Sequence, residues 1–534
     1  MTTWYVKPNA SHGGTNAGTS YDNAWQGWSA IVWGVGGVVG GDTLYVCGAH
    51  SYAAPITVGA HTGSSLATRC TISGAYAADP GSLTFSTNGD FLQNDRAWTR
   101  VTGLTINAST TGATNNNCIF HTGTADNCLY DFNVLNGSST AVSFSFYGET
   151  GNHHLNVEIS DNTFNGGGGA NGGAISWLVS TASAASTLTN ITIQRNVFRD
   201  VTNNNNNVIG FRTEDDTDAS SVMTGIVIDD NDFRNTKGVV LRLYHGHATL
   251  GIGGTLYVRR NTIVDAAISD QALGAAIHPR GFSGGVISDN VIRNVTGDAG
   301  GIDFQLCVGL RIHENDIDGV YTTNIDGNGI LFDAPGSNYC AAWGNKINNC
   351  YGKAGVFNSG VGIMFLEGVG NMAFGNTISD CVHGLHIGAQ DSGQSAQFYN
   401  NTLVNISAYG ISTTATADLA NCQVKNNIFV GDGYSVYDQT AVAWSAEDYN
   451  CFYGFSSGTS NHTLGANDIT TDPLLDASYR PTALSPCVGA GTYLKSARHF
   501  GGKRMSPVSP VIGAHGYYAA RAVATDRDVR LVGA

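Results

Sequence analysis

Along most of the chain, short runs of alternating apolar and polar residues end in the same three-residue phrase. The phrase is Asn, any residue, and then Phe, Ile or Leu. Successive copies lie between 25 residues (Asn290 to Asn315) and 35 residues (Asn196 to Asn231) apart. This period predicts a solenoid, because one copy is too short to bury its own apolar face and must stack on its neighbours. The phrase begins at Asn133, Asn162, Asn196, Asn231, Asn261, Asn290, Asn315, Asn345, Asn376, Asn401 and Asn427.

Each repeat contains two recognisable strands. One precedes the asparagine, as in residues 191–195 (ITIQR), and the other is built on Gly followed by Ile or Leu, as at Gly301, Gly329 and Gly362. Alternate residues of a strand point to opposite faces, so the apolar positions of both strands are predicted to face the interior. Because the asparagines recur once per coil, we expect them to form a ladder of side-chain amides that bonds coil to coil.

The two ends of the chain lack the regular repeat. Residues 1–60 read as a cap and leader, and residues 23–34 (NAWQGWSAIVWG) predict a short amphipathic helix over the first coil. Such a cap would cover the open core and unpaired edge of a solenoid. Residues 61–435 are predicted to form the body, and residues 436–534 an irregular C-terminal wrap and tail.

Composition supports an ordered β-rich chain and narrows its partners. The 534 residues include 70 Gly and 10 Pro, with 13% charged and 42% hydrophobic residues, which argues against disorder. The net charge of −15 makes nucleic acid a poor partner. No run of about 18 apolar residues predicts membrane insertion. The first residues also lack the charged and apolar regions of a signal peptide.

The 11 cysteines follow neither a disulfide pattern nor a zinc-binding pattern. They contain no CxxC pair, and Cys118, Cys128 and Cys422 occupy apolar strand positions. We therefore expect small buried thiols.

The repeat, the leader and the tail together resemble the pectate-lyase-like superfamily. The leader carries Trp4-Tyr-Val and Gly41-Asp-Thr-Leu-Tyr-Val, and the tail carries Asp472-Pro, Ser485-Pro and Ile512-Gly-Ala. The resemblance implies an all-β fold: a right-handed single-stranded parallel β-helix with an N-terminal capping helix, most similar to phage tailspike polysaccharide depolymerases. It also implies a homotrimer and an extracellular or virion-associated location. The superfamily hosts several activities, so function is argued from the residues.

Aligning the Gly-Ile strands by their inward residues predicts two outward columns that cross the middle coils. The first column is Arg242, His278, Asp303, Leu331, Met364, His386 and Ser412. The second is Tyr244, Arg280, Gln305, Asp333, Leu366 and Gly388. Near the strand ends lie Glu214, His245, His247, Glu367 and Asp391. In a chain with few charges, this concentration predicts a shallow groove for an extended glycan.

Two aspartates in these columns predict acid/base hydrolysis. Asp303 and Asp333 occupy neighbouring coils and are offset by two residues, which corresponds to about 8 Å at ordinary strand spacings. Inverting glycosidases hold their carboxyl groups about 6.5–9.5 Å apart so that water fits between them. Glu367, one coil further on, is an alternative partner.

The same face could instead support a uronate polysaccharide lyase. Arg242 or Arg280 would neutralise the substrate carboxylate, while His278 or Tyr244 would move the proton. Arg212 stands nearest to the position where lyases that this chain resembles place a lysine. A third hypothesis is a non-catalytic glycan-binding spike or adhesin, since such proteins share this fold.

Further residues are predicted to bind the substrate around this face. Glu214, Arg212, His245 and Gln305 could contact sugar hydroxyl groups. Trp177, with Phe211 on the neighbouring coil, is either a sugar-stacking residue or part of the core. No cofactor is required by this chemistry. An acidic stretch could bind calcium, or could be a solvated insertion; it contains Glu214, Asp215, Asp216 and Asp218.

Overall fold

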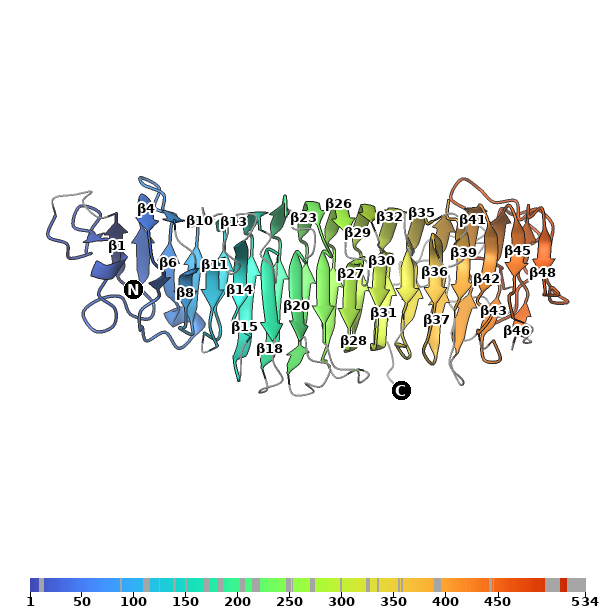
Figure 1. Ribbon diagram of the computed structural model, residues 1–534, viewed down its shortest axis with the longest axis horizontal. Coiled ribbons are helices and arrows are strands. Elements are labelled where there is room, and N and C mark those ends of the chain that lie inside the picture. Colours follow the sequence, from blue (N-terminus) through green and yellow to red (C-terminus); the bar gives the residue numbers. More distant parts are fainter. Residues whose placement is uncertain are drawn as a thin grey trace.

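The computed structural model of the chain is a long rod of stacked parallel strands (Figure 1). The structure describes residues 1–8, 14–86, 89–108, 116–123, 125–137, 141–148, 151–167, 173–179, 186–201, 207–213, 221–245, 251, 253–268, 274–297, 300–322, 327–333, 336–353, 356, 359–388, 395–417, 419–440, 444, 446–494 and 510–515.

Among the described residues, the strands form three parallel sheets of 18, 15 and 15 strands. The first sheet contains β1 (Thr3–Lys7), β2 (Trp25–Gln26), β3 (Thr43–Val46), β6 (Cys70–Ser73), β9 (Thr99–Thr102), β12 (Leu129–Asp131), β15 (His153–Ser160), β18 (Thr187–Gln194), β21 (Val222–Thr224), β22 (Ile226–Asp229), β25 (Leu256–Arg259), β28 (Ser283–Ser288), β31 (Val308–His313), β34 (Ala341–Trp343), β37 (Asn371–Phe374), β40 (Ala396–Tyr399), β43 (Gln423–Lys425) and β46 (Ala446–Asp448).

The second sheet contains β4 (Ala49–Tyr52), β7 (Ser82–Phe85), β10 (Thr105–Ala108), β13 (Val134–Gly137), β16 (Thr163–Gly166), β19 (Val197–Arg199), β23 (Asp232–Lys237), β26 (Thr262–Ile268), β29 (Val291–Gly297), β32 (Asp316–Tyr321), β35 (Lys346–Tyr351), β38 (Thr377–Ser379), β41 (Thr402–Ile406), β44 (Ile428–Gly431) and β47 (Cys451–Tyr453).

The third sheet contains β5 (Ile56–Thr57), β8 (Asp90–Asn94), β11 (Asn116–His121), β14 (Ala141–Phe146), β17 (Ile175–Val179), β20 (Ile209–Thr213), β24 (Leu241–Tyr244), β27 (Ala275–Arg280), β30 (Gly300–Phe304), β33 (Ile330–Phe332), β36 (Val361–Phe365), β39 (His383–Ile387), β42 (Tyr409–Thr413), β45 (Tyr434–Tyr437) and β48 (Gly458–Ser460).

One coil therefore visits the three sheets in turn, and the next coil pairs with it in parallel. The strand before each asparagine belongs to the first sheet and the Gly-Ile strand to the third. The sequence did not predict the third strand of each coil. This strand begins directly after the asparagine and belongs to the second sheet. Parallel crossovers of this kind are right-handed, and the predicted right-handed parallel β-helix is confirmed.

A sharp corner between the first and second sheets explains why the phrase recurs. The residue before each asparagine has a positive φ, for example 55° at Phe132, 54° at Arg195 and 53° at Arg260. A single left-handed residue bends the chain from the first sheet into the second, and the asparagine that follows is buried at this corner.

The predicted asparagine ladder is present and continues one coil further than expected. The Nδ2 atom of Asn261 donates to Oδ1 of Asn290 at 3.0 Å, and the backbone N–H of Asn261 donates to the same oxygen at 3.0 Å. The same pair of bonds joins Asn427 to Asn450, at 2.9 and 3.0 Å. Each side-chain amide thus satisfies buried polar groups of its neighbour.

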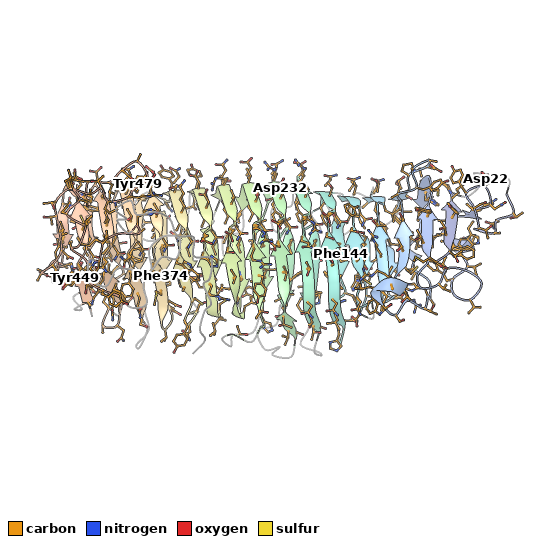
Figure 2. All side chains as sticks on the ribbon, turned by 180° about the vertical axis from the view of Figure 1, so that it is seen from behind. Asp22, Phe144, Asp232, Phe374, Tyr449 and Tyr479 are labelled. Carbon is orange, nitrogen blue, oxygen red and sulfur yellow. The ribbon has the colours of Figure 1, made fainter. Side chains whose placement is uncertain are left out.

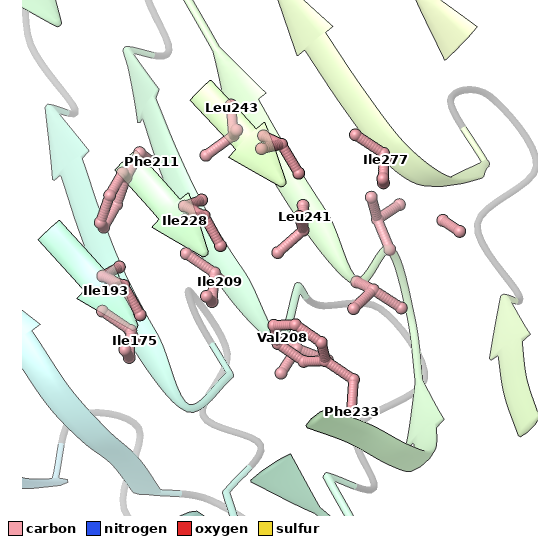
Figure 3. Close-up of a cluster of buried hydrophobic side chains, with 14 of the residues drawn as sticks. Ile175, Ile193, Val208, Ile209, Phe211, Ile228, Phe233, Leu241, Leu243 and Ile277 are labelled. Atoms are coloured by element: carbon pink, nitrogen blue, oxygen red, sulfur yellow. The ribbon is translucent and has the colours of Figure 1, made fainter. Parts of the chain in front are cut away.

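The interior is filled by apolar side chains from all three sheets. Figure 3 shows residues such as Ile193, Ile209 and Leu241 meeting in the core. Rings also stack from coil to coil, with centroids 4.7 Å apart for Phe164 and Phe198 and 4.6 Å apart for Phe198 and Phe233. All 11 cysteines are buried free thiols, which confirms the prediction.

The N-terminal capping helix that the sequence predicted is absent from the described residues. The segment instead forms strand β2 and a three-residue 3₁₀ turn, η1 (Trp28–Ala30); a second such turn, η2, spans Leu66–Thr68. The prediction was wrong because Gly27 adopts φ 79°, which a helix does not allow, and because β2 pairs with β1. Trp28 covers the core while its Nε1 donates to the carbonyl of Thr57 at 2.8 Å.

The sheets extend beyond residues 61–435 at both ends, from Thr3 to Ser460. Residues 461–494 and 510–515 contain neither helix nor strand, and they return along earlier coils. Nδ2 of Asn426 donates to the Thr492 carbonyl at 2.7 Å, and the Gly513 N–H donates to the Asn426 carbonyl at 2.7 Å. The described part of the chain holds no helix with the length and apolar character needed to traverse a bilayer.

Candidate functional site

The third sheet brings the predicted polar columns together. Arg242 of β24 pairs with His278 of β27, and Tyr244 pairs with Arg280. Arg280 in turn bridges to Gln305, directly after β30. Asp303 pairs with Leu331 of β33. This register agrees with the alignment made from the sequence. We call seven residues of four adjacent coils the outer-face cluster: Arg242, Tyr244, His278, Arg280, Asp303, Gln305 and Asp333.

The ring of Tyr244 lies at the cationic end of the outer-face cluster. The guanidinium carbon of Arg280 is 4.4 Å from its centroid, and that of Arg242 is 5.4 Å away. The ring of His278 meets it edge-on, with centroids 6.3 Å apart. Cation–π contacts of this kind hold both guanidinium groups beside the phenol.

The two aspartates lie at the other end of the outer-face cluster. Nε2 of Gln305 donates to Oδ2 of Asp333 at 2.5 Å, which fixes the orientation of that carboxylate. Asp333 stands two residues beyond Leu331, the partner of Asp303, so the predicted offset is present. Ordinary strand spacings convert this offset to about 8 Å between the positions.

Several polar members of the outer-face cluster are enclosed. His278 is 0% exposed, Asp303 6% and Arg280 8%. Arg242, Tyr244 and Asp333 are half-buried. Exclusion of water strengthens charge interactions with anything bound here.

The other predicted binding residues have different surroundings. Arg212 of β20 pairs with Tyr244 and extends the second column by one coil. Glu367 lies two residues beyond β36, and its Oε2 accepts a hydrogen bond from the Gly336 N–H at 3.1 Å. Glu214, the acidic stretch around it, His247 and Asp391 lie outside the described residues.

Trp177 and His245 are buried inside the coil. Trp177 of β17 is 0% exposed and pairs in register with Phe211 inside the coil. Trp177 is therefore a core residue and not a sugar-stacking residue. His245 is likewise 0% exposed, and its Nε2 contacts the carbonyl oxygen of Ser221. The prediction that they bind substrate was wrong, because strand alternation turns both side chains inward.

Sequence reasoning missed an apolar and aromatic stretch that continues the same face toward the C-terminus. Leu331 and Met364 are followed by a group in which the ring of Tyr409 lies 4.8 Å from His383 and 4.7 Å from Tyr437. Tyr437 pairs with Ser412 and so extends the first column. The signal was Gly433 followed by residues 434–437 (YSVY), which repeat the glycine-led strand pattern.

The histidines of this stretch are neutral near pH 7. Burial lowers the pKa of His386 to about 3, and the nearby His383 adds to this effect. Burial lowers the pKa of His383 to about 4. Nδ1 of His386 lies 2.8 Å from the Ser412 hydroxyl oxygen. Within the described ranges, no group of three or more His, Cys, Asp or Glu side chains is arranged to hold a metal ion.

Comparison with known proteins yields likenesses of fold. No protein-family model matches the chain, and no curated protein matches it. Among solved structures, the Dettilon tailspike protein matches 73% of this chain and 61% of its own, with 12% identity and a TM-score of 0.36. The mannuronan C-5 epimerase AlgE6 A-module of Azotobacter vinelandii covers 88% of this chain and 100% of its own, with 12% identity and a TM-score of 0.37.

A PL6 family polysaccharide lyase from Pseudopedobacter saltans covers 89% of this chain and 95% of its own, with 13% identity and a TM-score of 0.32. The fold assignment rests on the chain's own sheets and not on these matches. With three parallel sheets and an internal asparagine ladder, the chain is a right-handed parallel β-helix.

Proposed function

We propose that the outer face of the third sheet binds an extended polysaccharide and cleaves it. One observation carries the proposal: two aspartates on neighbouring coils lie in one enclosed cluster with two arginines, a histidine and a tyrosine. In a chain whose charged residues are only 13% of the total, this concentration on one face is suited to chemistry on a sugar.

The favoured reaction is hydrolysis by the carboxyl pair. Asp303 and Asp333 act as acid and base, with water between them, because their offset of about 8 Å falls in the range of inverting enzymes. Gln305 holds Asp333 in position through its 2.5 Å hydrogen bond. Tyr409 and Tyr437, on the same face, offer aromatic surfaces to sugar rings further along the chain of the substrate.

Purified protein incubated with bacterial capsular polysaccharides tests this reaction. Reducing ends should accumulate without ultraviolet absorbance, and Asp303→Asn and Asp333→Asn should each slow cleavage by about 100-fold or more while glycan binding persists. Asp232→Asn is the matched control, since Asp232 is ion-paired with Arg234 on the second sheet. If both variants of the pair keep full activity, the assignment of the carboxylates is incorrect.

A lyase reaction is the second candidate, because Arg280 and Arg242 flank the Tyr244 ring at 4.4 and 5.4 Å. These cations would neutralise a uronate carboxylate while Tyr244 or His278 removes the adjacent proton. The glycosidic oxygen then departs and a carbon–carbon double bond forms. The same incubation would show ultraviolet absorbance, and Tyr244→Phe or His278→Gln would abolish it.

A non-catalytic spike or adhesin is the remaining hypothesis. It requires tight glycan binding with neither reducing ends nor absorbance in the same incubation. We propose an extracellular or virion-associated location for all three candidate functions, because each requires contact with surface glycans. Calcium, if bound through the acidic stretch, would be revealed by calcium-dependent activity.

A further inference from the structure

A second pocket lies on a different sheet from the outer-face cluster. It has a volume of about 520 Å³ and is lined on one side by β35 and β38, including Lys346, Asn348 and Asp380, and on the other by Tyr479 and Arg480. Its volume is in the range of about 300–1,000 Å³ that small ligands occupy. Figure 2 shows Tyr479 between Tyr449 and Phe374 along the rod, so the chain beyond the last strand has returned to earlier coils to form one wall.

The returning wall is held in shape by its own hydrogen bonds. Oδ1 of Asp476 accepts from the backbone N–H of Ser478 at 2.8 Å and of Arg480 at 2.9 Å. The backbone N–H of Asp476 donates to the Arg480 carbonyl at 2.8 Å. Nearby, the ring of His515 lies 3.2 Å from the Thr377 hydroxyl. The pocket is therefore preorganised rather than assembled around a ligand.

The charges at this pocket differ from those elsewhere on the surface. Arginines such as Arg195 and Arg260 form ion pairs with Asp161 and Asp230. Among the described residues, the side chains of Lys346 and Arg480 form neither an ion pair nor a side-chain hydrogen bond. Arg480 does have an acidic neighbour, because its backbone N–H and then its charge help to lower the pKa of the Asp476 carboxyl. The lining holds two cations, Lys346 and Arg480, against one carboxylate, Asp380, in a protein with a net charge of −15. This local excess of positive charge favours an anionic ligand.

The polar groups between these cations suit a hydroxylated ligand. Oδ1 of Asn348 accepts from the Ser379 hydroxyl at 2.6 Å, which orients the amide and leaves its Nδ2 as a donor. Oδ1 of Asp380 is held by the Asn405 side chain at 3.0 Å, and the other carboxylate oxygen is an acceptor for hydroxyl groups. A ligand that matches this set carries one negative charge and several hydroxyl groups.

We propose that this pocket binds an acidic sugar residue, in which a carboxylate is attached to a hydroxylated ring. Lys346 and Arg480 contact the carboxylate, and Asn348 and Asp380 contact the hydroxyl groups. The aromatic ring of Tyr479 forms part of the wall, where the apolar side of a sugar ring can pack. The site is separate from the proposed catalytic face, so it does not depend on cleavage.

Calorimetric titration of the full chain with glucuronic acid, and with glucose and sulfate as comparison ligands, tests this proposal. Glucuronic acid should bind more tightly than either, and added salt should weaken it. The double substitution Lys346→Met with Arg480→Gln should reduce its affinity at least 10-fold. The control Lys353→Met removes an exposed lysine outside the pocket and should leave affinity unchanged.

Asp303→Asn should also leave this affinity unchanged, which separates the pocket from the proposed catalytic site. Glucose binding as tightly as glucuronic acid would show that charge is not recognised and would overturn the proposal. Sulfate binding as tightly would exclude recognition of the sugar ring. If the double variant binds glucuronic acid with the same affinity as the original chain and unfolds at the same temperature, the acidic sugar does not bind in this pocket.

Discussion

At the scale of single residues, the asparagine ladder makes the strongest demand on side-chain identity. Asn261 donates to Asn290 and to the Ile228 carbonyl at 2.9 Å, and its Oδ1 accepts from the backbone and side chain of Asn231. A short amide is needed here, because it must supply donors and an acceptor within one buried corner. The asparagines are therefore structural, as the sequence indicated.

Replacing one ladder residue should destabilise the rod measurably. Asn261→Ala leaves buried partners of Asn231 and Asn290 unsatisfied, at a cost of about 2–4 kcal/mol in the free energy of unfolding. The control is Asn165→Ala: Asn165 is a half-buried residue that donates only to Asn136, at 2.9 Å, and its loss should cost less than about 1 kcal/mol. Denaturant midpoints of the two variants provide the comparison. Equal midpoints would contradict a special role for the ladder.

A carboxylate at the end of the ladder should make the last coil sensitive to pH. Burial, followed by the neighbouring Glu447, raises the pKa of Asp468 to about 8. An unfolded aspartate has a pKa of about 3.9, so between these values only the folded state binds the proton. Stability therefore falls as pH rises from about 4 to 8, by up to about 1.4 kcal/mol per pH unit.

Hydrogen exchange of the Asn450 and Gly465 amides reports this effect, since both donate to Asp468 at 2.7 Å. Protection should decrease toward pH 8 beyond the intrinsic change in exchange rate, and Asp468→Asn should remove the decrease. Asp472→Asn, at an exposed position, is the control. A variant that retains the full pH dependence would assign it to another group.

At the scale of elements, the glycines of several Gly-Ile strands leave room for side chains of the second sheet. A Cβ added to Gly362 would lie 2.4 Å from Cγ2 of Ile378, and one added to Gly329 would lie 2.4 Å from Cγ2 of Ile347. At these positions, glycine is required by the close packing of the third sheet against the second sheet. This requirement explains why the third-sheet strands could be aligned from sequence alone, and with them the polar columns.

Gly362→Ala should overpack this contact and destabilise the protein by about 1–3 kcal/mol. Ile378→Ala removes the closest atoms that the new methyl group would meet and leaves the Gly384 carbonyl oxygen at 3.0 Å, so the substitution should cost less in that background. A double-mutant cycle of unfolding free energies measures the difference. Additive effects of the two substitutions would show that the glycine is required for another reason.

At the scale of the whole molecule, the chain is a rod whose stability and surface repeat along one axis. Each coil contacts its neighbours, and residues at equivalent outward positions line up from coil to coil. The outer-face cluster and the aromatic stretch beyond it occupy the third sheet, whereas the second pocket uses the second sheet and the returning C-terminal segment. Ligands at the two sites would not compete.

The homotrimer expected from the sequence resemblance is a prediction at this scale. Sedimentation of the purified full chain should give three times the monomer mass, because parallel packing of three rods buries one side of each. A monomer mass at all concentrations would exclude it. The proposed cleavage does not require the trimer, since the outer-face cluster lies within one chain.

The coils, the asparagine ladder, the buried cysteines and the register of the polar columns follow from the amino-acid pattern alone. These features repeat once per coil, and the period of two along a strand assigns each side chain to a face. The apolar periodicity gave a wrong prediction near the N-terminus. The expected helix does not form there, because Gly27 has a positive φ and β2 pairs with β1. The periodicity also left both interpretations of Trp177 open.

The three-dimensional structure was needed to show which outward residues are enclosed and which distant segments meet. The burial of His278 and Asp303, the contact of Gln305 with Asp333 and the pocket between Lys346 and Arg480 are such features. The physical reason is that burial and contacts between segments far apart in sequence depend on how the whole coil and the returning chain pack. A local sequence repeat specifies the direction of each side chain and the spacing of the coils. It does not specify which distant segments cover a face of the rod.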